Sequence, residues 1–450
     1  MSRFTSYYLY QRYEKVGDGE WTPTYPNEYS ISGDSSDPMP LVIKEQNDAN
    51  CGYYSPIYRW TNTEDTICVY DGHDYSRDYL TIESESNNHE IYWQSLPHAA
   101  LSQTTVPKTI SVSTDNGATW TAYTSTSGDN GTLIATLNEG EKVLLKGTNA
   151  AYGEYGGYYN RFKTNSRASN VKRCKVYGNI MSLLYGDNFT GQTTLTEDST
   201  FFYLFGGLDY SLTSAENLIL PATTLATNCY RWMFSNCYYL TAVPELPATT
   251  LASYCYNNMF AGCTSLTTAP ALPATTLAER CYDAMFAYST SLTVAPELPA
   301  TTLANNCYHQ MFAGCTSLTT APALPATTLA ERCYDAMFEG TSLTTAPELP
   351  ATTLATYCYS NMFNGCTSLT NAPVLSAATL VNGCYSNMFR DCTNLNYIKC
   401  MATNISSMGN LCTFGWVDGV ASTGTFVKDA NTTWTTGNDG IPNNWTIQNA

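Results

Sequence analysis

Seventeen cysteines stand out in this 450-residue chain, because thiolates bind zinc and paired thiols form disulfides. Cys255 and Cys263 are eight residues apart, which corresponds to about 12 Å along a helix. A disulfide needs Cα atoms within about 7 Å of each other. No Cys-x-x-Cys pair occurs, and the four histidines are scattered. We therefore expect buried free thiols that pack as small apolar groups, with no zinc, and folding in a reducing compartment.

The other reactive side chains form no grouping typical of an active site. The sequence has no nucleophile elbow, zinc-protease motif, phosphate-binding loop or dinucleotide-binding glycine motif. One acidic cluster lacks the glycine and distal glutamate of a calcium loop. We interpret it as a polar loop and leave calcium open; its members are Asp71, His73, Asp74 and Asp78. The sequence predicts a protein that is not an enzyme and that needs no metal or cofactor.

A charged triplet occurs twice in the second half of the chain. Glu279, Arg280 and Asp283 return as Glu331, Arg332 and Asp335. An arginine three residues before an aspartate forms a weak ion pair on a helix surface. Acid–base catalysis would need a buried or recessed site. The triplets are therefore predicted to be a set of charges on helix surfaces.

Variable polar and aromatic residues flank a recurring Cys-Tyr pair. Such side chains suit sugars or proteins, because aromatic rings stack and amides donate and accept hydrogen bonds. The alternative is that exposed positions drift freely. The candidate ligand-contact residues are Trp232, Tyr254, Asn257, Asn258, His309, Gln310, Tyr357 and Asn361.

These residues belong to an internal repeat that dominates the second half of the chain. The proline of the motif Leu-Pro-Ala-Thr-Thr recurs every 25 or 26 residues, at Pro221, Pro247, Pro273, Pro299, Pro325 and Pro350, with Ser376 in the same place. With a degenerate first copy, about eight units span residues 193–402. Units of this length indicate a solenoid, because one unit cannot bury its own apolar face.

One unit, residues 246–271, predicts a short helix followed by a very short strand. Leu251, Cys255, Met259 and Cys263 recur every four residues, which is typical of an apolar helical stripe. Thr249 and Thr250 are suited to cap the start of this helix, and Gly262 is suited to end it in a left-handed conformation. A strand then starts at Leu266 and stops before Pro270, since proline lacks a ladder donor.

This unit resembles the BspA-type leucine-rich repeats. The shared pattern is a short strand, a proline, a Thr-rich turn and a helix with a hydrophobic pair before a cysteine. Here the pair is Met-Phe, as in Met259-Phe260 before Cys263, where the family has Ala-Phe. The unit is slightly longer than usual, and Ala269 stands where a larger aliphatic residue is normal. The resemblance covers roughly 210 residues and implies a binding surface of the kind found on bacterial surfaces and in crAss-like phages that infect Bacteroides.

The first 170 residues have the alternating pattern of β-strands. Hairpins are predicted at 108–125, around an Asp-Asn-Gly turn, and at 133–148. The first contains Ser113-x-Asp115-x-Gly117-x-x-Trp120, which resembles the structural Asp-box hairpin of sialidases. The expected fold class is mixed β and α/β, with a leucine-rich-repeat-type solenoid. The expected domains are a docking β module at 1–75, a β-sandwich-like domain at 76–170, a linker at 171–192, the solenoid at 193–402 and a C-terminal cap at 403–450.

Charge and composition narrow the function. The formal charge is −17 and only 13% of residues are charged, which argues against nucleic-acid binding. The chain shows no signal-peptide core and no apolar stretch long enough to span a membrane. We expect a phage virion protein of the fibre type, assembled in the bacterial cytoplasm. Its N-terminal modules would dock onto other virion proteins, a homotrimer being one assembly, and its repeats would bind a host glycan or protein. The alternative is a bacterial cell-surface adhesin.

Overall fold

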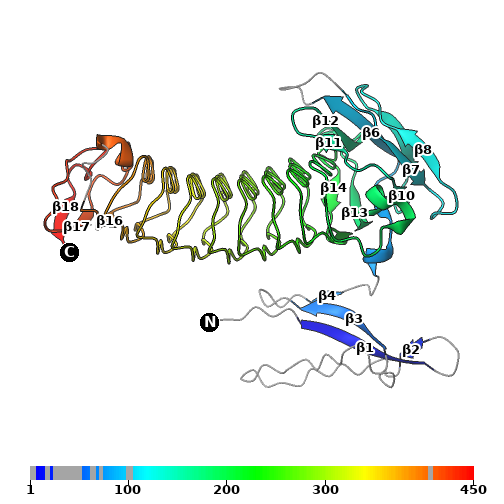
Figure 1. The fold of residues 1–450 in the computed structure, drawn as a ribbon, viewed down its shortest axis with the longest axis horizontal. Coiled ribbons are helices and arrows are strands. Elements are labelled where there is room, and N and C mark those ends of the chain that lie inside the picture. Colours follow the sequence, from blue (N-terminus) through cyan, green and yellow to red (C-terminus); the bar gives the residue numbers. More distant parts are fainter. Residues whose placement is uncertain are drawn as a thin grey trace. The chain divides into compact units, whose positions relative to one another are not determined.

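The computed structural model describes the backbone of four N-terminal strands and residues 74–97, 105–403 and 409–450. The chain divides into two compact units, Met1–Asp74 and Tyr75–Ala450. The described strands of the first unit form one antiparallel sheet in the order β2-β1-β3-β4. These are β1 (Tyr7–Lys15), β2 (Trp21–Pro23), β3 (Tyr53–Trp60) and β4 (Ile67–Val69), shown in Figure 1. The β module expected here is thus present in the strands that are described.

The second unit begins with a region of two sheets. One has the order β14-β13-β5-β10-β7-β8, with β15 also paired to β13, and the other has the order β11-β12-β6-β9. Both sheets contribute to one hydrophobic core. The strands are β5 (Leu80–Ser84), β6 (His89–Pro97), β7 (Thr109–Ser113), β8 (Thr121–Thr124), β9 (Thr132–Leu137), β10 (Lys142–Lys146), β11 (Gly153–Glu154), β12 (Tyr158–Thr164), β13 (Cys174–Asn179), β14 (Leu212–Ser214) and β15 (Leu218–Ile219).

The two predicted hairpins have different outcomes. The first is confirmed, because β7 and β8 pair antiparallel around the turn at Asn116 and Gly117. There the Asp115 carboxylate accepts hydrogen bonds from Ser113 and Thr119. The second is wrong, because β9 pairs with β6 whereas β10 pairs with β5 and β7. The turn at residues 138–141 therefore carries the chain from one sheet to the other.

Residues 171–192 are not the predicted linker. Strand β13 lies inside the larger sheet, antiparallel to β5 and parallel to β14 and β15 of the first repeat. The helices α1 (Ser182–Tyr185) and η2 (Gly186–Asn188) follow it, and η1 (Tyr75–Arg77) precedes β5. Within β13, Lys175 forms an ion pair with Glu83 of β5 at 2.9 Å. The two-sheet region and the repeats are consequently one compact unit.

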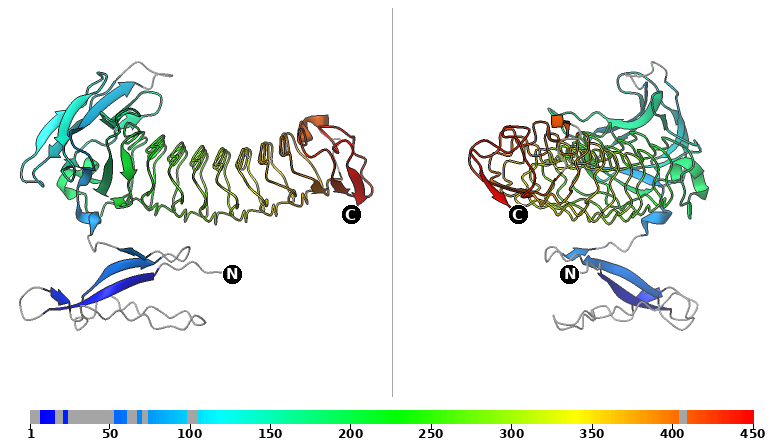
Figure 2. Two further views of the ribbon diagram at one scale, coloured as in Figure 1. Left: turned by 180° about the vertical axis from the view of Figure 1, so that it is seen from behind. Right: turned by 60° about the vertical axis from the view of Figure 1, so that its left-hand side comes forward.

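The repeat units stack side by side, as the periodicity predicts (Figures 1 and 2). Adjacent units are joined by parallel bridges at the Thr-Thr of each Pro-Ala-Thr-Thr motif, for example Thr276 with Thr302. A second series of bridges joins the Leu-Thr-Thr segments, for example Thr320 with Thr345. The leucines of both segments are buried and these threonines are exposed. Each predicted short strand is thus reduced to one bridging residue.

The predicted helix of each unit is wrong; a chain of consecutive turns takes its place. In one unit Cys255 donates its amide to Ala252, Asn257 to Tyr254 and Met259 to Tyr256, so every second amide closes a turn. The amides between them donate to the next unit, as Tyr256 does to Cys281 and Phe260 to Met285. A helix would direct every one of these amides to its own fourth preceding residue. Half of the hydrogen bonds therefore hold neighbouring units together.

The turn chain has a repeat of four residues, whereas a helix has 3.6 residues per turn. Residues Tyr254, Asn258 and Gly262 all have positive φ, at 59°, 54° and 72°. The two residues after each of the first two point inward, giving the buried pairs Cys255-Tyr256 and Met259-Phe260. The spacing of four that indicated a helical stripe therefore belongs to this turn chain.

Two columns of stacked rings form the core of the array. The tyrosine column includes Tyr256, Tyr282 and Tyr308, whose ring centroids are 5.9 and 5.8 Å apart. The phenylalanine column includes Phe260, Phe286 and Phe312, with centroid distances of 5.7 and 5.8 Å. All of these rings are at most 1% exposed. The columns thus supply the apolar burial that makes stacking favourable.

Both columns begin in the two-sheet region, which covers the first unit. Trp93 of β6 contacts Tyr152 and Phe162, with ring centroids 5.6 and 4.8 Å away. Tyr152 then stacks on Phe201 and Phe162 on Phe205 of the degenerate first repeat. The amide of Phe162 also donates to the carbonyl of Leu204 at 2.9 Å. The two-sheet region is therefore the N-terminal cap of the array.

Both columns end at Trp416, whose ring lies 6.2 Å from Tyr385 and 6.3 Å from Phe389. Trp434 stacks on its other side at 5.5 Å. The inter-unit hydrogen bonds continue beyond residue 402, since Tyr385 donates to Cys412 and Phe389 to Trp416. The segment predicted as a cap therefore starts with one more turn unit, around η3 (Gly409–Thr413). The parallel strands β16 (Tyr397–Cys400), β17 (Thr425–Lys428) and β18 (Thr446–Asn449) complete this end.

Candidate functional site on the turn edge

The turn chains of successive units form one continuous surface, which we call the turn edge. It runs from Asn228–Asn236 in one unit to Gly383–Asp391 in another. Each unit contributes three residues with positive φ, spaced four apart. The first column contains Asn228, Tyr254, Arg280, Asn306, Arg332, Tyr357 and Gly383; the second contains Trp232, Asn258, Ala284, Gln310, Ala336, Asn361 and Asn387. The third contains Asn236, Gly262, Tyr288, Gly314, Gly340, Gly365 and Asp391.

Several of these positions hold residues that do not suit their backbone. Glycine and asparagine adopt positive φ readily, whereas other residues are strained there by about 1–2 kcal/mol. Trp232, Tyr254 and Tyr357 nevertheless have φ values of 58°, 59° and 54°. Asn or Gly occupies the same columns in other units, so the fold itself does not require a large side chain there. These aromatic residues therefore contribute something that the solenoid core does not need.

Seven of the eight predicted ligand-contact residues are partly exposed on the turn edge, and Asn257 is not. Six of the eight lie in the first two columns: Trp232, Tyr254, Asn258, Gln310, Tyr357 and Asn361. Asn257 and His309 occupy the position that directly follows the inward tyrosine. Asn257 is only 2% exposed and its Nδ2 donates to the carbonyl of Asp283 at 3.2 Å. Asn257 is thus a structural residue and its prediction as a ligand contact is wrong.

Asp283 organises the centre of the turn edge. Its side chain is 8% exposed; Oδ1 lies 2.8 Å from His309 Nδ1 and Oδ2 lies 2.9 Å from Arg280 Nη1. This carboxylate also comes from the position after the inward tyrosine, one unit before His309. The contact fixes the His309 ring on the surface. Asp283 is therefore a buried anchor, and its prediction as a helix-surface charge is wrong.

Asp335 repeats this arrangement two units further along. Its side chain is 4% exposed, and Oδ2 lies 2.7 Å from Arg332 Nη1. Asn361 donates to Asp335 Oδ1 at 3.2 Å. The Arg332 guanidinium lies 4.3 Å from the ring centroid of Tyr357, a cation–π contact. The buried Asp335 carboxylate thus positions Arg332 and Asn361, and Arg332 in turn contacts Tyr357.

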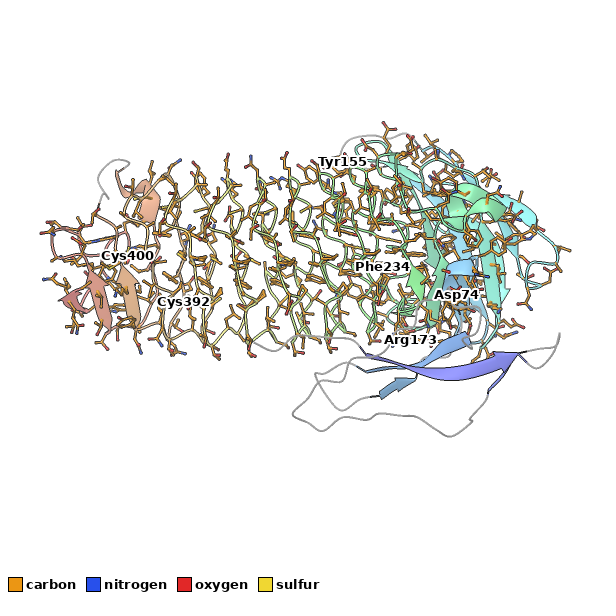
Figure 3. The ribbon with its side chains drawn as sticks, turned by 60° about the horizontal axis from the view of Figure 1, so that its bottom comes forward. Asp74, Tyr155, Arg173, Phe234, Cys392 and Cys400 are labelled. Atoms are coloured by element: carbon orange, nitrogen blue, oxygen red, sulfur yellow. The ribbon has the colours of Figure 1, made fainter. Side chains whose placement is uncertain are left out.

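A third cluster lies where the two-sheet region meets the repeats. The Arg231 guanidinium carbon is 4.1 Å from the ring centroid of Tyr155 and 4.9 Å from those of Trp232 and Tyr254. Tyr155 follows β11 and is 43% exposed. Figure 3 shows it at the end of the array that carries the two-sheet region. The turn edge therefore extends onto the two-sheet region.

Sequence reasoning missed two exposed aromatic residues on this surface. Tyr288 is 65% exposed with φ 61°, in a column that holds glycine in the flanking units. The sequence signal for Tyr288 was that this unit has Tyr288-Ser289 where the neighbouring repeats have Gly-Cys. Tyr155 gave no such signal, because it lies outside the repeats and reaches the turn edge only through the fold.

The described cysteines and candidate metal ligands can be assessed directly. All fifteen cysteines that are described are free and buried, and burial raises the pKa of thiols such as Cys307 to about 12. Within the described ranges no three His, Cys, Asp or Glu side chains are placed to hold a metal ion. Asp71 and His73 of the polar loop lie outside those ranges. Of the helices described, none is long and apolar enough to cross a membrane.

Comparison with known proteins bears on the repeats. The family model for the BspA type leucine rich repeat region matches residues 210–319 and 279–414, in six copies. No curated protein and no solved structure matches the chain. The matched residues coincide with the stacked units from β14 to the last turn unit around Cys412. Residues 210–414 are therefore a BspA-type leucine-rich repeat region.

Proposed function

We propose that this protein is a non-enzymatic recognition protein whose turn edge binds a glycan or protein on a host cell. The observation that supports this is the placement of Trp232, Tyr254 and Tyr357 at positive φ. Their backbone favours Asn or Gly, so the large rings are retained at a cost in stability. Aromatic faces beside amides and guanidinium groups are suited to stack on sugars or to anchor a protein partner.

The biological setting we propose is a phage virion, with the protein serving as a fibre or related receptor-binding component. The unit Met1–Asp74 would attach it to other virion proteins or to further copies of itself. The composition supports this setting, because the surface is polar but poor in charge. A bacterial cell-surface adhesin is the alternative and would use the same turn edge.

The test uses the full chain and substitutions that preserve the backbone. Tyr254→Asn and Tyr357→Asn remove two rings but leave residues that accept positive φ. Thr275→Asn and Thr327→Asn are the matched controls, since both threonines are exposed on the bridging segments. We expect the tyrosine variants to lose attachment to host cells and to immobilised host glycans, and the threonine variants to retain it. Equal attachment by all four variants would refute the turn edge as the binding surface.

The virion setting needs its own measurement. Mass spectrometry of purified phage particles should detect this chain among the structural proteins. Its detection in the cell envelope of uninfected bacteria, and not in particles, would favour the adhesin.

A further inference from the structure

We infer that the cluster of Arg231, Tyr155, Trp232 and Tyr254 is a subsite for a sugar that carries a carboxylate. This inference rests on the proposed glycan binding and names the chemical class of one bound residue.

Among the residues described, no carboxylate forms an ion pair with Arg231, and Asp283 acts on its charge only from a greater distance. The other turn-edge arginines each pair with a carboxylate: Arg280 with Asp283, Arg332 with Asp335, and Arg390 with Asp391 and Asp418. Arg231 Nη1 donates to Asn228 Oδ1 at 3.1 Å, the guanidinium also hydrogen-bonds the Tyr155 side chain, and Nε has no acceptor. An uncompensated charge that is 8% exposed is costly. Burial accordingly lowers the pKa of Arg231 from its usual value.

The rings around Arg231 supply the rest of a sugar site. Three ring centroids lie within 4.9 Å of the guanidinium carbon, so the cation is framed by aromatic faces. Phe202 supports Trp232 from the first unit at 5.4 Å. Tyr155 and the two repeat residues come from different parts of the fold, so the frame forms only when the two-sheet region caps the array. A carboxylate at its exposed rim would neutralise Arg231 while the sugar ring stacks on an aromatic face.

The positive charge of Arg231 would make the cluster selective between charged and neutral ligands. The chain carries a formal charge of −17, so an anion is repelled from most of the surface and attracted to this cluster. A charge-assisted hydrogen bond is about twice as strong as a neutral one. The cluster should therefore prefer an acidic sugar over a neutral sugar of the same ring shape.

The experiment compares methyl β-glucuronide with methyl β-glucoside, which differ in a carboxylate, by ligand-observed NMR titration of the full chain. We expect the glucuronide to bind at least about tenfold more tightly. Arg231→Met should abolish that preference, and Arg332→Met, which removes a compensated guanidinium beside Tyr357, should retain it. Circular dichroism checks that each variant is folded.

A second variant covers the case in which Arg231→Met does not fold. Tyr155→Ala changes a residue that is 43% exposed and should weaken binding of both glycosides while the protein stays folded. Equal affinity of the two glycosides, or a preference that survives Arg231→Met, would overturn the acidic-sugar subsite. Absence of binding by either glycoside, with host attachment intact, would overturn it as well. The proposed function is tested separately, by the attachment of the Tyr254→Asn and Tyr357→Asn variants to host cells.

Discussion

The sulfhydryl of Cys315 lies 3.1 Å from the carbonyl oxygen of Phe286, one unit earlier in the array. Cys263, Cys366 and Cys392 donate in the same way to Phe234, Phe338 and Phe363. Where the column lacks cysteine, Ser289 donates to Phe260 of the preceding unit at 2.9 Å, whereas Thr341 donates to Phe338 of its own unit at 2.9 Å. Cysteine or serine at this position therefore bonds a phenylalanine carbonyl of the preceding unit. The thiols of this column are more than the small apolar groups that their spacing predicts.

The first prediction tests that role. Cys315→Ser should change the free energy of unfolding little, since Ser289 performs the same task. Cys315→Ala should cost about 1 kcal/mol, because the Phe286 carbonyl loses one of its two donors. Urea denaturation of the full chain measures both. Equal losses for the two variants would show that packing alone matters at this position.

The second prediction concerns the ring columns. Phe312 is fully buried between Phe286 and Phe338, at centroid distances of 5.8 and 5.7 Å. Phe312→Ala should cost about 3–5 kcal/mol, as large-to-small core substitutions do. Phe312→Leu is the control and should cost less than half as much. A loss below about 1 kcal/mol for the alanine variant would mean that neighbouring units close the gap.

The third prediction uses the strained Tyr288. A Cβ added at Gly314 would lie 2.6 Å from Tyr288 Cδ1, whereas a Cβ at Gly340 meets nothing closer than 4.0 Å. Both glycines have positive φ, at 71° and 67°, so alanine costs about 1 kcal/mol at either site from strain. Gly314→Ala should cost roughly 1 kcal/mol more, through overpacking. This additional destabilisation at Gly314 should vanish when Tyr288 is replaced by glycine, which a double-mutant cycle measures. If the additional destabilisation persists in the Tyr288→Gly protein, the Gly314–Tyr288 contact is not its cause.

The fourth prediction concerns acid stability of the two-sheet region. His89 is fully buried beside Ser84, whose Oγ is 3.0 Å from Nδ1, and burial lowers the His89 pKa to about 4 from the ordinary 6.5. Between those pH values the unfolded chain binds a proton that the folded chain excludes. The contribution of His89 to the free energy of unfolding is therefore fully present above pH about 6.5. It falls by roughly 3 kcal/mol as the pH drops to about 4. Urea denaturation at several pH values should show a smaller fall for His89→Gln.

The fifth prediction concerns thiol reactivity. All described cysteines are buried, and burial raises the pKa of Cys255 and Cys400 to about 12. The thiolate is the reactive form, so a disulfide reagent should leave these thiols unmodified at neutral pH in the native protein. In denaturant without reductant, the 13 cysteines from Cys229 to Cys400 should all react. Fewer than about ten reactive thiols would indicate disulfides within the array.

Sequence periodicity predicted the stacking of the repeats, because each unit returns the same leucines and rings to the same core. It did not predict the turn chain. Cysteine, methionine and phenylalanine at a spacing of four fit a helical stripe, and the competing signal was Asn or Gly every four residues, as at Asn258 and Gly262. That signal is masked in units where Tyr254 or Arg280 takes the same position.

The turn edge was predicted in outline from the residues that vary around Cys-Tyr. The burial of Asn257 and Asp283 was not predictable from the sequence, because their polar side chains are satisfied by contacts with neighbouring units. The link between β13 and the first repeat also escaped prediction, since a parallel pair between distant segments leaves no local pattern. Tyr155 reaches the turn edge through a second contact between distant segments, in which its amide donates to Ser199 Oγ of the first repeat.

The ring columns also set the length of the array in equal steps. Each unit advances the array by one ring step, about 5.8 Å between Tyr282 and Tyr308, and every interior step is made by the same residue types. Residues 261–286 and 313–338 are identical in sequence. An exchange between these two blocks would delete 52 residues, which is two units, and leave each remaining ring stacked on an equivalent ring. The distance between the Trp93 and Trp416 ends can therefore change in whole steps over evolution while the fold, and the chemistry at each end, stays the same.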